Sequence, residues 1–276
     1  MTDILWFLAA PFAACVVLVL MLGYLGLHVL LREVIFVDLA LAQIAAFGVV
    51  VAFYFGYPPE SVHSFAFALG AATVGAAIFS WTRMRDERVP QEALIGITFV
   101  IASAASILVA DRAPEGAEHI KELLAGTVLW VSWERVLGNL AICALVAVLH
   151  LLFRRRFVQI SEAPEEAFAA GVRVRWWDFL FYLSFGLVIT VAVETAGVLM
   201  VFAYLVGPAI IALSTSRSWI ARLLVAWSAG IAASLLGLAA SYRWDLPSGP
   251  AIVVSLGLLL FAFGLWRVAW SKTSAD

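Results

Sequence analysis

The chain has 276 residues, of which 64% are hydrophobic and only 13% are charged. Soluble domains carry about 25% charged residues, so a mean hydropathy of +1.02 excludes an ordinary soluble protein and indicates a chain that folds in lipid. The net charge of −2 says little about nucleic acid, but no basic stripe with interleaved aromatic residues appears, so we expect no nucleic-acid partner. Each crossing needs roughly 20 apolar residues, so we expect a single transmembrane domain over residues 1–276.

The apolar runs predict the membrane spans in chain order. The first run continues past Cys15 to about residue 27, and Asp3 lies where a cleaved signal peptide would carry basic residues, so we expect a retained span. The segment 177–214 is long enough for two spans with a turn near Glu194. The fold class is therefore all-α, a polytopic membrane protein with nine spans, or eight if one run is re-entrant. The other runs lie at about 35–54, 64–81, 93–110, 137–153, 223–241 and 250–270.

The basic residues predict the orientation. With the N-terminus outside and nine crossings, 13 of the 17 lysine and arginine residues fall on the inner side. Cytoplasmic loops of membrane proteins carry such an excess. The residues placed outside are Arg112, Lys121, Arg135 and Arg243, and all the others are placed in the cytoplasm.

The second span carries an acid, Asp38, among almost exclusively apolar neighbours. Burying a carboxylate there is costly unless it faces a partner, a cation or water. One interpretation is that Asp38 lines a pathway through the membrane. The alternative is a carboxylate near the inner end of the span that pairs with an arginine or caps a neighbouring helix.

Gln43 is the second polar residue of this span. It lies 11 residues beyond Arg32, about 16 Å along a helix, and therefore near the middle of the bilayer. Asp38 and Gln43 are about 140° apart around a helix, so they do not share one face. Gln43 contacts an ion or makes a hydrogen bond between helices. His28 and His150 fall near predicted span ends, which favours interfacial side chains over ligands.

A short polar segment, 161–172, follows three consecutive arginines. Ser161 can cap a short helix, Pro164 and two glutamates suit its first turn, and Gly171 can close it in the left-handed conformation. Such a helix cannot span a membrane. It is either a solvated connector or a docking helix for a partner protein.

Several segments together resemble the membrane permeases of zinc- and manganese-type ABC importers. The resemblance covers most of the chain in the correct order, although each motif is weak alone. The segments that carry it are the second span, 95–99, 124–132, 161–172, 197–209, 241–242 and 247–250.

The resemblance implies a homodimer in the cytoplasmic (inner) membrane of a bacterial-type cell, with the pathway at or near the dimer axis. It implies a separate ABC ATPase on the cytoplasmic side and an extracytoplasmic metal-binding protein that delivers the ion. Asp38 and Gln43 would contact the transported divalent metal, and no cofactor would be bound covalently. A coupling segment at about 157–176 would dock on the ATPase through Glu165, Glu166, Phe168 and Gly171.

The chain departs from the family at one position. The family has Asp-x-x-x-His in an early span, but the histidine position here is Ala42 counted from Asp38, or Gln43 counted back from Gly48. Histidine is a good zinc ligand, whereas amides and carboxylates suit harder cations. Zinc specificity is therefore in doubt, and manganese, another divalent ion or a chelated metal are the alternatives.

Two other classes of protein stay open. An ion-coupled secondary transporter would show an inverted repeat, and no clear repeat is present. A membrane-embedded enzyme would need clustered ligands or a nucleophile with a base, and neither is found. The chain also lacks a Gly-x-x-x-x-Gly-Lys-Ser/Thr loop. We therefore expect a transport subunit that is not itself an ATPase.

Overall fold

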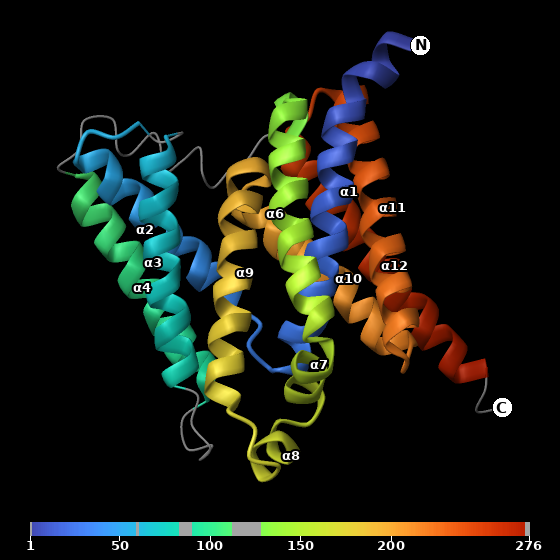
Figure 1. The fold of residues 1–276 in the computed structure, drawn as a ribbon. Coiled ribbons are helices and arrows are strands. Elements are labelled where there is room, and N and C mark those ends of the chain that lie inside the picture. The colour runs from blue at the N-terminus through green and yellow to red at the C-terminus, as the bar shows by residue number, and fades with distance from the viewer. Residues whose placement is uncertain (1, 59–60, 83–89, 112–127, 274–276) are drawn as a thin grey trace. The chain divides into compact units, whose positions relative to one another are not determined.

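A computed structural model describes residues 2–58, 61–82, 90–111 and 128–273 (Figure 1). In this part of the chain the structure is all-helical, as predicted, with eleven α-helices and one 3-10 turn. Nine of the described helices are long and apolar enough to cross a membrane. They are α1 (Thr2–Leu31), α2 (Val37–Tyr54), α3 (Val62–Trp81), α4 (Gln91–Ala110), α6 (Trp133–Leu152), α9 (Val174–Ala196), α10 (Val198–Thr215), α11 (Trp219–Trp244) and α12 (Ser248–Thr273).

The first compact unit comprises Met1–Leu27, Thr127–Leu140 and Leu199–Asp276. Its helices approach closely because small residues lie at their contacts. A Cβ atom at Gly237 of α11 would collide with the backbone of Ile252 on α12. Polar groups also join these helices, since the Trp227 indole donates to the carbonyl oxygen of Leu20 at 2.9 Å. The 3-10 turn η1 (Val128–Trp130) packs beside α12.

The second unit comprises His28–Gly126 and Ala141–Val198. Within it α2, α3 and α4 lie side by side, and α9 packs against α2 and α3 (Figure 1). Gly48 lets α2 touch α3, because a Cβ atom there would stand 2.5 Å from the carbonyl oxygen of Phe67. Most of α2 is buried by these neighbours. The helix that carries both predicted polar residues is therefore held firmly inside this unit.

Two short helices, α7 (Arg154–Glu162) and α8 (Pro164–Ala169), precede α9 (Figure 1). The short helix expected from the sequence is α8, and the turn that closes it contains Gly171, whose φ of 71° is left-handed as predicted. The amide of Val172 donates to Ala167 and that of Gly171 to Phe168, the pattern of a Schellman closure. The prediction for Ser161 was wrong: it lies within α7, and Ala163 occupies the N-cap of α8.

The long apolar segment 177–214 is divided into two helices, as predicted, but the break lies at Gly197, three residues beyond the turn expected near Glu194. α9 ends at Ala196 and α10 begins at Val198, and Gly197 between them has φ 76° and ψ 158°. The first span differs from its prediction, because α1 continues to Leu31. This extension places His28 inside the last turn of the helix. Residues 124–127 of the loop motif lie outside the described residues.

Candidate functional site

Asp38 lies in the first turn of α2 and is only 2% exposed. Its Oδ1 atom has no hydrogen-bond partner among the described residues. A helix N-terminus stabilises a carboxylate through its free N–H groups. None of these groups donates a hydrogen bond to the buried Oδ1 atom of Asp38. Arg32, the arginine nearest to Asp38 in sequence, forms its ion pair with Asp178 and so does not neutralise Asp38. The carboxylate is therefore able to accept a cation.

A second carboxylate, Glu92, fixes the turn that leads into Asp38. Glu92 lies in the first turn of α4, and its two carboxylate oxygens accept the backbone N–H groups of Ile35 at 3.3 Å and Phe36 at 3.0 Å. The same turn contains Glu33 with a left-handed φ of 57°. Glu92 therefore holds the start of α2, and no sequence motif connects it with Asp38.

Gln43 is half-buried on α2. It makes no hydrogen bond with a described residue, so the predicted interhelical bond is not formed in this part of the chain. No three His, Cys, Asp or Glu side chains converge among the described residues in a way that would hold a metal. Among the described residues, therefore, neither Asp38 nor Gln43 belongs to a preformed metal cage.

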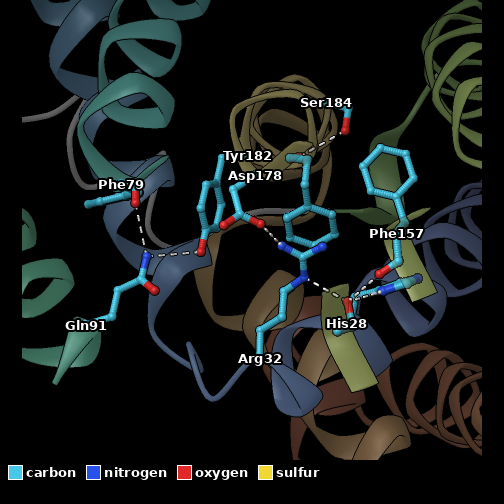
Figure 2. Close-up of polar contacts among 10 residues, drawn as sticks. His28, Arg32, Phe79, Gln91, Phe157, Asp178, Tyr182 and Ser184 are labelled. Atoms are coloured by element: carbon cyan, nitrogen blue, oxygen red, sulfur yellow. Dashed lines mark hydrogen bonds and ion pairs between the residues drawn. The ribbon is translucent and has the colours of Figure 1, made fainter. Parts of the chain in front are cut away.

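Arg32 forms a buried polar centre close to the start of α2 (Figure 2). Its Nη1 donates to Oδ1 of Asp178 at 2.5 Å, and its Nε donates to Oγ of Ser161 at 2.8 Å. The guanidinium carbon also lies 4.0 Å from the ring centroid of Phe181, a cation–π distance. Arg32 therefore connects the α1–α2 turn to both α7 and α9.

His28 and His150 extend this centre. Ser161 donates its single proton to the carbonyl oxygen of Phe157, so His28 Nδ1, at 2.8 Å from Ser161 Oγ, must be the donor. By the same argument His150 Nε2 donates to Ser184 Oγ at 2.8 Å, because Ser184 donates to a backbone carbonyl. The rings of the two histidines are 6.4 Å apart between centroids.

The prediction that both histidines are interfacial was therefore wrong. His28 is 0% exposed and His150 is 2% exposed. The partners of His28 and Arg32 lie on α7 and α9, more than 120 residues away in the chain. The basic residue Arg32 directly after an apolar span and the acid Asp178 early in another were the only signals for this cluster.

The predicted coupling residues lie on and directly after α8. Glu165 and Glu166 are exposed in its first turn, and Gly171 is exposed in its closing turn. Phe168 is half-buried and packs against a small core. Because Ser161 of the adjacent α7 bonds to Arg32, α8 is linked through α7 to the turn before α2. That core consists of Ile160, Ala167 and Val174, joined by Val172 and Trp177.

Comparisons with known proteins place the chain among transport proteins of the membrane. The family described as the ABC 3 transport family matches residues 5–267. A "Probable iron transport system membrane protein" of Haemophilus influenzae is 29% identical over 68% of this chain and 67% of its own length. The "Manganese transport system membrane protein MntC" of Listeria innocua is 27% identical over 87% of this chain and 83% of its own.

Solved structures share the fold. PsaBC from Streptococcus pneumoniae, solved in complex with a Fab, superposes with a TM-score of 0.77 at 22% identity, covering 95% of this chain and 93% of that one. An inward-facing putative metal-chelate type ABC transporter gives a TM-score of 0.69 at 18% identity, covering 93% of this chain and 85% of the other.

Proposed function

The chain belongs to the ABC 3 transport family, and we propose that it is the permease subunit that carries a divalent metal ion of the manganese and iron class into the cell. The single observation that carries this proposal is the buried Asp38 carboxylate with a hydrogen-bond acceptor left open. A charge inside a span marks an ion pathway by default. The relatives named for manganese and iron support the class of cargo.

The ligand chemistry favours a hard cation. Asp38 supplies a carboxylate and Gln43 an amide oxygen, both of which suit manganese better than a thiolate or imidazole site would. The ion meets these groups in passing and keeps part of its hydration shell, because two side chains on different sides of one helix cannot enclose it. Glu92 contributes indirectly by holding the first turn of α2 in place.

A separate ATPase supplies the energy through α8. The exposed Glu165 and Glu166 offer a charged surface, and the Schellman closure at Gly171 fixes the shape of the segment. A displacement of α8 would be transmitted by α7 to Arg32, which also holds Asp178 on α9. Because Arg32 immediately precedes the turn that opens α2, docking at α8 is coupled mechanically to Asp38.

The complete importer would contain two copies of this permease, two ATPase subunits and an extracytoplasmic binding protein. The test is uptake of radioactive manganese, iron and zinc into vesicles that hold the permease together with its partner ABC ATPase. We expect ATP-dependent manganese or iron uptake that the free divalent ion saturates. Uptake that needs a chelator, or that follows a proton gradient without ATP, would contradict the proposal.

A further inference from the structure

A groove with a volume of about 820 Å³ lies between α3, α8 and the first turns of α9. This volume is in the range of ligand pockets, roughly 300–1,000 Å³. The part farthest from the helix ends is lined by Val74 and Ala77 of α3 and by Phe179 of α9. Two hydroxyl groups also reach the groove, but Thr73 donates to Leu69 and Ser80 to Ala77 within α3. These two hydroxyl groups are therefore not free to donate to a ligand, and the side chains that line the deep part of the groove are apolar.

The groove is basic near the start of α9. Arg173 and Arg175 both line it, and no acidic residue is among the described lining residues. Both arginines are exposed, and neither forms an ion pair with a described carboxylate. The ligand that complements this surface has an anionic group next to a long apolar body.

The distance that the groove runs along α3 distinguishes a lipid ligand from a soluble protein partner. Thr73 lies eight residues before Trp81, the last residue of α3, which is about 12 Å along the helix. A soluble protein docked outside the membrane cannot follow a span that far, whereas an acyl chain lies along it. Trp81 and Trp176 line the groove at the ends of two spans, where aromatic residues meet lipid head groups. The exposed Val74 continues this surface towards the lipid.

We propose that this groove binds an anionic phospholipid, with its phosphate on Arg173 and Arg175 and one acyl chain along α3. Phe168 of α8 also lines the groove, so the bound lipid touches the segment assigned to ATPase docking. Anionic lipid would then stabilise the docking-competent position of α8. Only this last consequence rests on the proposed function, because lipid binding itself requires neither transport nor the ATPase.

The test is native mass spectrometry of the purified full-length permease titrated with phosphatidylglycerol or with phosphatidylcholine. Each arginine near an anionic lipid head group contributes about fivefold in affinity, so R173Q/R175Q should weaken phosphatidylglycerol binding roughly 25-fold. Phosphatidylcholine, whose phosphate is neutralised by its own choline group, should lose much less. The matched control is R154Q/R155Q, which removes the same charge from exposed positions of α7 outside the groove. It should change binding less than about twofold. R173K/R175K keeps the charge and should retain binding.

Ala77→Phe places a bulky side chain in the apolar part of the groove without altering charge. This variant still tests the site if R173Q/R175Q folds poorly. It should weaken retention of both phospholipids. Equal losses in R173Q/R175Q and R154Q/R155Q would show general charge attraction and overturn the site. Unchanged phosphatidylglycerol binding in Ala77→Phe, combined with loss of ATPase binding, would assign the groove to the ATPase instead. Failure of lipid binding with normal metal uptake would leave the transport proposal intact.

Discussion

Arg32 and Asp178, 146 residues apart in the chain, form an ion pair with both side chains fully buried. Removing one partner of a buried pair leaves the other charge unpaired and costs about 3–5 kcal/mol. We therefore expect Asp178→Asn to lower the thermal unfolding temperature of the detergent-purified permease markedly. The double variant R32M/D178L, which removes both charges, should recover most of the lost stability.

The double variant also separates the effect of Arg32 on stability from its proposed effect on the coupling between ATPase docking and transport. If Arg32 transmits motion from α7 to the start of α2, R32M/D178L should fold and bind the ATPase but transport poorly. Stability and uptake are measured on the same preparation. Full uptake by the double variant would show that the pair only supports the fold.

Gly171 adopts a left-handed conformation with φ 71°, which costs a residue with a side chain about 1–2 kcal/mol. We expect Gly171→Ala to distort the end of α8 and weaken ATPase binding by up to about tenfold. Gly70→Ala is the matched control, because Gly70 is helical and a Cβ atom there meets nothing within 4 Å. Binding of the purified ATPase to each variant in nanodiscs gives the comparison. Equal affinities for both variants would exclude a docking role for this closure.

The orientation derived from the basic residues is open to a labelling test. Val62, at the start of α3, is 82% exposed, and Ala169, at the end of α8, is also exposed. The native Cys15 and Cys143 are buried and give little background. An impermeant thiol reagent added to intact cells should label Val62→Cys and should label Ala169→Cys only after permeabilisation. The reverse pattern would invert the topology.

Gln43 occupies one of the two positions at which the family's histidine would fall. Imidazole is a better ligand for zinc than an amide is. Gln43→His should therefore raise zinc uptake relative to manganese, whereas Gln43→Ala should lower manganese uptake modestly without favouring zinc. Parallel uptake assays with both ions decide the point, and an unchanged zinc-to-manganese ratio in Gln43→His would remove Gln43 from the pathway.

The spans were predictable because hydropathy and glycine breaks are local signals. The left-handed end of α8 at Gly171 followed from such a signal, and the length of segment 177–214 predicted two spans, although the break lies at Gly197 and not near Glu194. The α7 helix was missed because its three leading arginines mark a membrane boundary, while its buried face depends on distant residues. Ser161 looked like a cap, but its oxygen is used by Arg32 and His28.

The site was predictable only in part, for the same reason. A lone acid in an apolar span drew attention to Asp38 without any tertiary information. Glu92 and Asp178 became relevant only when folding brought them beside the α1–α2 turn. Whether Asp38 and Gln43 contact the ion stays a prediction, since it depends on transport itself.

The most direct test of the central claim compares Asp38→Asn with Asp245→Asn. The first change keeps the shape of a buried side chain and removes its charge, while the second makes the same change at an exposed residue after α11. Radioactive manganese uptake is measured in vesicles with the full complex, at equal expression and equal ATPase binding. We expect a loss of at least about tenfold for Asp38→Asn, equivalent to 1.4 kcal/mol, and wild-type uptake for Asp245→Asn. Wild-type uptake by Asp38→Asn would contradict it and leave Asp38 a structural residue.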